Sequence, residues 1–181
     1  MTEKETIRMS KFLSLVLRHE PERVGLKLGE AGWVGTDELL RAVNASGVAL
    51  RLDQLKHIVA TSDKKRFAFS EDGRRIRASQ GHSVEVDLQY PPQTPPEILY
   101  HGTATRFLDG IRKDGLQKMG RHEVHLSAEI KVTIQVGGRH GKPALLTIRA
   151  GEMHRAGFVF HCSANGVWLV DHVPAQFIEF P

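Results

Sequence analysis

The sequence contains a single cysteine, Cys162, and no run of about 18 apolar residues. One cysteine cannot form an internal disulfide or a four-thiolate zinc site, which excludes a small disulfide-stapled secreted domain. The N-terminal segment MTEKETIRMSKF has no apolar stretch of the kind found in signal peptides. We therefore expect a cytoplasmic protein with no membrane partner, and we take it to be a monomer.

The motifs of several common enzyme sites are also absent. The chain has no GxGxxG or GxxxxGK[ST] loop and no GxSxG motif, so neither a Rossmann nor a P-loop nucleotide site is supported. His122 and His125 are spaced like half of a zinc site, but no second pair matches them. Acidic residues are sparse in the second half of the chain. We expect no metal site.

The net charge is only +4, from 25 basic and 21 acidic residues, and arginine is more frequent than lysine. Arginine forms bidentate pairs with phosphate, which lysine does not. Residues 64–77, KKRFAFSEDGRRIR, hold six basic side chains and two acidic ones. Such a segment is typical of a solvated charged face, and also of a surface that follows a nucleic-acid backbone.

Four of the eight prolines fall within residues 91–96, PPQTPP. Proline-rich segments favour extended polyproline II structure and do not occur inside helices or central strands. We interpret residues 89–97 as a linker between two lobes, residues 1–88 and 98–181. A chain of 181 residues suits one domain or two small ones and can bury a hydrophobic core.

The first lobe is predicted to be mainly helical. Apolar residues with helical spacing indicate a helix over residues 10–19, which Pro21 limits. Thr36 is the expected N-cap of a second helix. A short strand is predicted at residues 33–34 and two helices at residues 36–43 and 52–60. A β-hairpin is predicted from residues 66–70 and 75–78. Helices followed by a hairpin describe a winged-helix fold, which is common in nucleic-acid binding.

The second lobe is predicted to consist mainly of short strands. Apolar runs indicate these strands at residues 98–101, 124–127, 144–148, 166–170 and 177–180. Two short helices are expected, over about residues 106–113 and 130–136. The fold class is therefore α+β.

Three groups of polar residues are candidate sites. Arg18 and His19 end a predicted helix, where cations complement the helix dipole or bind a phosphate. His101, Gly102 and Thr103 come at the end of an apolar strand, where glycine permits close approach of a ligand. The candidate RNA-binding residues are Lys64, Lys65, Arg77, Gln80, His82 and Ser83.

Eight strings spread over most of the chain occur together in a fixed order. They are SKFLSLVLRH (10–19), EAGWV (30–34), ATSDKKRF (60–67), IRASQGHS (76–83), LYHGT (99–103), HEVHLS (122–127), RHGKPALL (139–146) and NGVWL (165–169). In these strings the sequence resembles the NAD-dependent RNA 2′-phosphotransferases, best known from tRNA splicing. Each string alone is unspecific, but eight in this order are highly specific.

The resemblance implies an N-terminal winged-helix lobe that faces RNA and a C-terminal ADP-ribosyltransferase-like lobe that holds NAD as a co-substrate. It also implies a reaction in two steps. An internal RNA 2′-phosphate attacks C1″ of the nicotinamide riboside and expels nicotinamide. Ribose O2″ then attacks the same phosphorus, which yields RNA with a 2′-hydroxyl and ADP-ribose 1″,2″-cyclic phosphate.

The resemblance also implies the roles of individual residues. The family's catalytic tetrad corresponds to Arg18, His19, Arg66 and Arg121. The implied NAD-binding residues are His101, Gly102, Thr103, His125, Ser127 and Arg139. Arginines neutralise a dianionic phosphate without changing protonation, and His19 either donates a hydrogen bond or shuttles a proton. Because the RNA phosphate is the nucleophile, no serine or cysteine nucleophile is needed, and Cys162 is expected to be structural.

Two other functions are alternatives at this point. A non-catalytic winged-helix nucleic-acid binder explains the first lobe but leaves the strings around His101 and His125 unexplained. An ADP-ribosyltransferase that caps terminal phosphates of nucleic acid would use the same NAD lobe and stop after the first step. The products formed from 2′-phosphorylated RNA and NAD distinguish these functions.

Overall fold

The computed structural model describes residues 1–62, 64–137 and 141–181, without the side chains of residues 132 and 135–137. The chain divides into two compact units, residues 1–89 and 90–181. Both units combine helices with antiparallel strands, which confirms the predicted α+β class. Among the described residues, no helix is long and apolar enough to cross a membrane.

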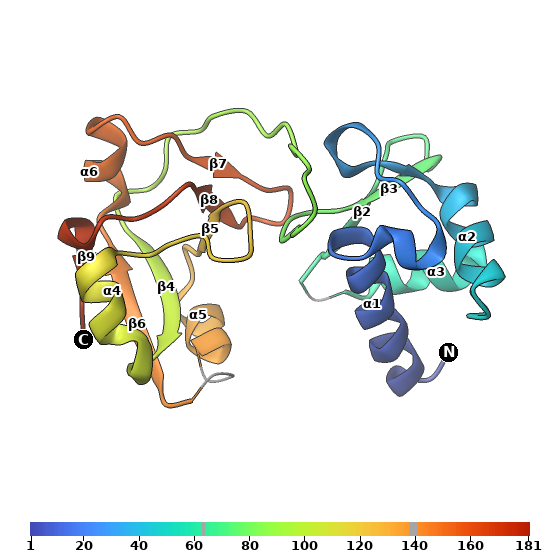
Figure 1. The fold of residues 1–181 in the computed structure, drawn as a ribbon, viewed down its shortest axis with the longest axis horizontal. Helices are drawn as coiled ribbons and strands as arrows, with labels where there is room; N and C mark the ends of the chain where they lie inside the picture. Colours follow the sequence, from blue (N-terminus) through green and yellow to red (C-terminus); the bar gives the residue numbers. More distant parts are fainter. Residues whose placement is uncertain (63, 138–140) are drawn as a thin grey trace. The chain divides into compact units, whose positions relative to one another are not determined.

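Three helices and a small antiparallel sheet form the described part of the first unit (Figure 1). The helices are α1 (Glu3–Arg18), α2 (Thr36–Ala45) and α3 (Leu52–Ala60). The strands are β1 (Val34–Gly35), β2 (Phe67–Phe69) and β3 (Arg75–Ala78), in the order β1-β3-β2. The predicted third helix and the hairpin are therefore confirmed.

The core of the first unit lies where the apolar faces of the helices meet the sheet. Leu13 and Leu17 of α1, Leu39 of α2, Leu55 of α3 and Ile76 of β3 are fully buried. Each such side chain contributes about 1.5–3 kcal/mol through removal of its apolar surface from water. This packing holds α1 against β3, one strand of the hairpin.

The start of α1 and the N-cap of α2 differ from the predictions. Helix α1 begins at Glu3, because Thr2 and Glu5 form a capping box: Glu5 N donates to Thr2 Oγ1 (3.3 Å) and Thr2 N donates to Glu5 Oε2 (2.7 Å). The prediction of Thr36 as an N-cap is wrong. Thr36 is the first residue of α2, and its hydroxyl donates to the carbonyl of Gly73 (2.9 Å), an acceptor that local sequence does not reveal.

The described part of the second unit contains two three-stranded antiparallel sheets with short helices. One sheet has the order β4-β6-β9, with β4 (Leu99–Ala104), β6 (Pro143–Ile148) and β9 (Ile178–Glu179). The other has the order β5-β8-β7, with β5 (Val124–Leu126), β8 (Trp168–Val170) and β7 (His161–Cys162). The helices are α4 (Leu108–Asp114), α5 (Ile130–Gly137) and α6 (Ala150–Arg155). Helix α6 and strand β7 are not among the elements predicted from the sequence.

Tyr100 and Ser127 connect the two sheets of the second unit. Tyr100 N donates to the Ser127 carbonyl (2.8 Å), and Ser127 N donates to the Tyr100 carbonyl (2.9 Å). Helix α5 follows Ser127 and packs against β4 and β6 (Figure 1). These contacts bring the strand segment around His101 next to the strand segment around His125.

The proline-rich segment is packed along the second unit from Pro92 onward. Pro92 pairs with His161 of β7, and Gln93 N donates to the carbonyl of Phe160 (2.8 Å). Near the end of the segment, the Glu97 carboxylate accepts two hydrogen bonds from Arg155 (2.7 and 3.1 Å). The predicted linker role of residues 89–97 stays a prediction.

Candidate functional site

Hydrogen bonds connect Arg18, His19 and Arg66 in the first unit. Arg18 ends α1, and its Nη2 donates to the carbonyl of Arg66 (3.4 Å), which also accepts from Ser79 N (2.9 Å). The Arg18 carbonyl accepts from Ser83 N (2.9 Å). Nδ1 of His19 lies 2.8 Å from Oγ of Ser83, a residue 64 positions away. Three distant segments of the chain therefore meet at one site.

A tight turn before the hairpin directs Arg66. Lys65 has a left-handed backbone (φ 40°), which costs about 1–2 kcal/mol for a residue with a Cβ. Three hydrogen bonds hold this turn: Lys65 N to the Ser62 carbonyl (2.9 Å), Arg66 N to Ser62 Oγ (3.4 Å), and Ser79 Oγ to the Lys65 carbonyl (2.9 Å). The backbone position of Arg66 is therefore set by main-chain contacts that do not involve its own side chain.

The site in the first unit is cationic. The Arg66 side chain is half-buried, and no carboxylate among the described residues forms an ion pair with it. Arg18 adds a second guanidinium, and the imidazole of His19 is adjacent in sequence. Arginines remain protonated at any physiological pH and present planar forks of donors. A phosphate dianion has the complementary charge and acceptor geometry.

The predicted RNA-binding residues occupy different environments. Lys65 and Ser83 are exposed and Lys64 is half-buried, all close in sequence to the site residues. His82, by contrast, is only 3% exposed and lies inside the unit beside Gly32. The side-chain oxygen of Gln80 is buried and has no hydrogen-bond partner in the described part of the chain.

Arg77 has contacts that tie together parts of the first unit. Its Nη1 donates to the carbonyls of Ala31 (3.2 Å) and Leu88 (3.1 Å). Its guanidinium lies over the ring of Trp33, 4.6 Å from the ring centroid. These contacts give Arg77 a position in the fold, and its predicted contact with RNA stays a prediction.

His101 is the central residue of the site in the second unit. Its Nδ1 donates to the backbone carbonyl of His125 (2.9 Å), so the other ring nitrogen, Nε2, presents a lone pair. Burial lowers the pKa of His101, and the charge of Arg121 lowers this pKa further, although the hydrogen bond to His125 opposes the shift. His101 is therefore a neutral hydrogen-bond acceptor at pH 7.

Arg121, His125 and the other described residues predicted to bind NAD are near His101 in the fold or in the sequence. Arg121 is exposed, and its Nη1 lies 3.4 Å from Nδ1 of His125. Gly102 pairs with a residue of β6, and Thr103 is buried at 8% exposure. The hydroxyl of Ser127 accepts from Glu129 N (3.0 Å) at the start of α5. Arg139 lies outside the described residues.

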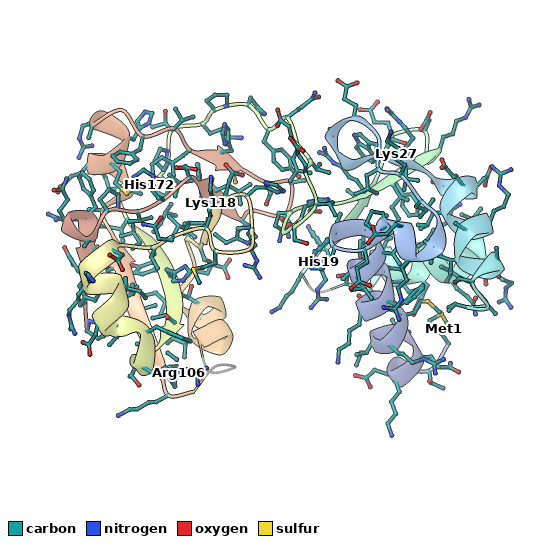
Figure 2. The ribbon with its side chains drawn as sticks, in the orientation of Figure 1. Met1, His19, Lys27, Arg106, Lys118 and His172 are labelled. Atoms are coloured by element: carbon teal, nitrogen blue, oxygen red, sulfur yellow. The ribbon has the colours of Figure 1, made fainter. Side chains whose placement is uncertain are left out.

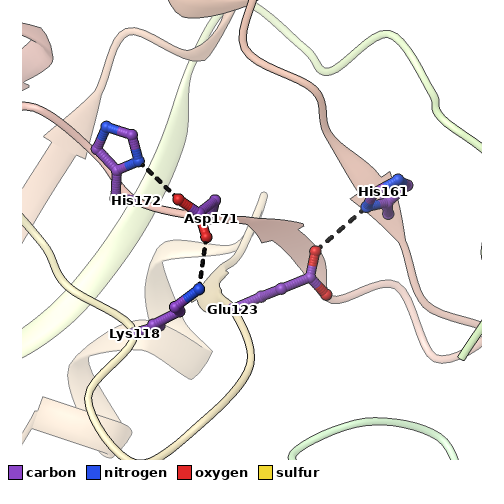
Figure 3. A network of polar contacts seen from close by, with 5 residues as sticks. All are labelled: Lys118, Glu123, His161, Asp171 and His172. Carbon is purple, nitrogen blue, oxygen red and sulfur yellow. Dashed lines mark hydrogen bonds and ion pairs between the residues drawn. The ribbon is translucent and has the colours of Figure 1, made fainter. Parts of the chain in front are cut away.

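Two polar contacts attach the loop that carries Arg121 to the β5-β8-β7 sheet (Figure 3). Lys118 Nζ lies 2.7 Å from Oδ1 of Asp171, the residue after β8, and this ion pair lowers the pKa of Asp171. Glu123 Oε1 lies 3.2 Å from Nδ1 of His161 in β7. These four residues are not predicted from the sequence, because the paired residues are 53 and 38 positions apart and no local pattern marks them.

Cys162 has no feature of a catalytic thiol. Its side chain is half-buried in β7, and burial raises the pKa of the thiol. A raised pKa keeps the thiol protonated near neutral pH, and a protonated thiol is a poor nucleophile. The described residues also contain no group of three side chains able to hold a metal ion.

Comparisons with known proteins show which family the chain belongs to. The sequence profile of the family described as RNA 2′-phosphotransferase, Tpt1/KptA, matches residues 4–172. The chain is 52% identical over 181 residues to "Probable RNA 2′-phosphotransferase" of Streptomyces coelicolor, covering 100% of this chain and 98% of that protein. Proteins of the same name from Nostoc punctiforme (48% over 179 residues, 99% of both chains) and Rhodopirellula baltica (52% over 180 residues, 99% and 98%) are also similar.

A match over nearly the whole chain to RNA 2′-phosphotransferases defines the class of protein as a transferase. The chain belongs to the RNA 2′-phosphotransferase, Tpt1/KptA family, and it is an RNA 2′-phosphotransferase enzyme. The resemblance found in the eight sequence strings is thereby confirmed. The alternative of a non-catalytic nucleic-acid binder is excluded.

Proposed function

We propose that the enzyme removes an internal 2′-phosphate from RNA, such as a spliced tRNA, by transferring it to NAD. The products are RNA with a 2′-hydroxyl, nicotinamide and ADP-ribose 1″,2″-cyclic phosphate, formed through a 2′-phospho-ADP-ribosylated RNA. The observation that carries this proposal is that hydrogen bonds connect Arg18 to the backbone of Arg66, and Arg18 and His19 to Ser83, which brings three cationic or titratable residues to one part of the first unit.

The catalytic residues proposed are Arg18, His19, Arg66 and Arg121. In the second step, negative charge develops on the nonbridging oxygens of the phosphate, and fixed guanidiniums stabilise that charge without transferring a proton. The contact with Ser83 orients the ring of His19. An oriented imidazole donates a hydrogen bond to the phosphate or moves the proton of the attacking hydroxyl.

The residues of the second unit fit NAD. Nε2 of His101 is an acceptor without a hydrogen-bond partner among the described residues, which suits a ribose hydroxyl. Gly102, without a side chain, allows the cofactor to approach the backbone of β4. We propose His101, Gly102, Thr103, His125 and Ser127 as residues that hold NAD. NAD supplies the ribose carbon that accepts the phosphate when nicotinamide leaves.

We further propose that the first unit is a winged-helix RNA-binding lobe and the second an ADP-ribosyltransferase-like NAD lobe. Three helices followed by the β2–β3 hairpin support the first assignment. Two antiparallel sheets, connected at Tyr100 and Ser127 beside His101, support the second.

The test is product analysis with an RNA that carries one internal 2′-phosphate. With NAD, we expect equimolar nicotinamide, 2′-hydroxyl RNA and ADP-ribose 1″,2″-cyclic phosphate. The same RNA without the 2′-phosphate is the control and should leave NAD intact. Release of inorganic phosphate without consumption of NAD would overturn the proposal. A stable ADP-ribosylated terminal phosphate would instead support the capping activity.

A further inference from the structure

Helix α1 carries a stripe of basic side chains that leads to Arg18. Lys4, Arg8, Lys11 and Arg18 are spaced at i, i+4, i+7 and i+14, and about 100° of rotation per residue places them within an arc of about 80°. Lys4, Arg8 and Lys11 are exposed. Figure 2 labels His19 at the end of α1 that lies away from the N-terminus. The three residues Lys4, Arg8 and Lys11 are called the α1 stripe below.

The fold itself does not use the α1 stripe. The core-facing side of the helix is formed by Met9, Leu13, Val16 and Leu17, on the opposite side. Lys4, Arg8 and Lys11 form no ion pair or hydrogen bond through their side chains with any residue that the structure describes. Three unpaired cations of one sign on one face repel each other and contribute nothing evident to stability.

The acidic residues of α1 do not neutralise the α1 stripe. Glu3 and Glu5 each lie about 60° beyond an edge of the arc, and the positions four residues after them are Ile7 and Met9, so no i,i+4 ion pair forms. Glu5 lies three residues before Arg8, and their charges interact weakly without an ion pair between the described side chains. Hydrogen bonds with Thr2 are the main cause that lowers the pKa of Glu5, and the charge of Arg8 is the smallest cause. The charge of Arg8 is therefore only weakly offset by Glu5, and the α1 stripe still presents positive charge to solvent.

We propose that the α1 stripe binds the backbone phosphates of the RNA strand that flanks the 2′-phosphate. This inference rests on the proposed function, in which Arg18 at the end of the same helix binds the 2′-phosphate itself. At about 1.5 Å per residue, Lys4 lies about 21 Å along the helix axis from Arg18 and Lys11 about 10 Å. At about 3.4 Å of rise per nucleotide, the length of α1 from Lys4 to Arg18 spans about six nucleotides, and the α1 stripe itself spans about three.

The observations favour RNA over a membrane as the occupant. An amphipathic helix that lies on a membrane inserts its apolar face into the lipid. In α1 that face is occupied, because Leu13, Val16 and Leu17 are fully buried in the core. The exposed face of α1 carries positive charge and leads to Arg18, the residue proposed to bind the 2′-phosphate. Neutralisation of phosphates by lysine and arginine supplies most sequence-independent affinity for nucleic acid.

The test compares two triple variants that lose the same charge. The test variant is Lys4→Gln, Arg8→Gln and Lys11→Gln. The matched control is Lys27→Gln, Arg41→Gln and Lys56→Gln, three exposed cations elsewhere in the first unit with no ion pair to any described residue. Glutamine is a good helix former, so α1 should remain intact, which circular dichroism checks.

Each protein is assayed with a 2′-phosphorylated dinucleotide and with a 12-nucleotide RNA that carries an internal 2′-phosphate. For the test variant we expect KM for the long RNA to rise about tenfold or more at low salt. We also expect the slope of log(kcat/KM) against log[salt] to become shallower by about 2, since each lost single-strand phosphate contact removes about 0.7. The dinucleotide KM and the KM for NAD should stay unchanged in both variants.

Binding of the 12-nucleotide RNA is also measured by fluorescence anisotropy, which separates this inference from the proposed function. If the wild-type enzyme turns over neither substrate, the proposed function is overturned. Weaker RNA binding by the test variant, but not by the control variant, would still support RNA binding by the α1 stripe. Equal KM, binding and salt slope for test and control variants overturn the inference. Loss of binding to phosphatidylserine vesicles with unchanged RNA binding also overturns it.

Discussion

Replacing Arg66 by alanine is expected to remove catalysis while leaving the fold and NAD binding intact. The carbonyl of Arg66 accepts from Arg18 Nη2 and Ser79 N, and these bonds to the backbone survive truncation of the side chain. No described carboxylate pairs with the guanidinium, so the variant leaves no buried charge uncompensated. The residues proposed to hold NAD all belong to the second unit. The loss should therefore appear only where phosphate is bound.

The magnitude follows from the role of the guanidinium. Removing one preorganised donor to a developing oxyanion costs about 2.7–4 kcal/mol, which corresponds to a decrease of about 10²–10³ in kcat. Arg66→Lys keeps the charge and loses the bidentate fork, so it should recover only part of this loss. Because truncation creates no cavity in the core, the melting temperature should change by no more than a few degrees.

The assay is single-turnover release of the 2′-phosphate at saturating NAD, with NAD affinity measured separately by calorimetry. We expect the Arg66→Ala rate to fall by the stated factor and the Kd for NAD to change less than about twofold. Turnover of Arg66→Ala close to that of the wild type would refute the assigned role. A large loss of NAD affinity would place Arg66 at NAD rather than at the phosphate.

Three further predictions concern positioning, protonation and the backbone. Ser83→Ala removes the 2.8 Å contact with His19, which is worth about 1 kcal/mol. We therefore expect kcat to fall about fivefold and the KM for NAD to stay unchanged; an unaltered kcat would contradict a positioning role of Ser83. Burial lowers the folded-state pKa of His101, so the unfolded chain binds more protons than the folded chain below about pH 6.5. The melting temperature should therefore fall more steeply with decreasing pH in the wild type than in His101→Gln. Parallel plots of melting temperature against pH for the two proteins would refute this. Gly115→Ala at φ 73°, where a Cβ would meet the Val173 carbonyl, should cost more than about 1 kcal/mol in urea unfolding, whereas Gly110→Ala, with open space around it, should not destabilise.

Local sequence patterns were sufficient for much of the secondary structure. The third helix was predicted with the bounds that the structure has, and the hairpin around Glu71-Asp72-Gly73 was placed correctly, because spacing of apolar residues and turn chemistry act over a few residues. The start of α1 was missed although Thr2-x-x-Glu5 is a local capping-box signal. Strand β7, only two residues long, gives too short a pattern to detect.

The sequence alone determined which residue types are present, most of the helices and strands, and, through eight strings in order, the family. It also named Arg18, His19, Arg66, His101 and Arg121. Only the tertiary structure decided that Ser83, 64 positions away, orients His19, and that Asp171 and His161 hold the loop of Arg121. Such contacts depend on how distant segments pack, which no local pattern encodes.

The protonation state of His101 shows the same division. The sequence supplies an imidazole with an ordinary pKa near 6.5. Burial in β4 and the nearby charge of Arg121 lower its pKa, so it is neutral, and the hydrogen bond to the carbonyl of His125 decides that Nδ1 keeps the proton. Desolvation and charge proximity are properties of the folded chain, because they depend on which groups exclude water from a side chain and which charges lie beside it.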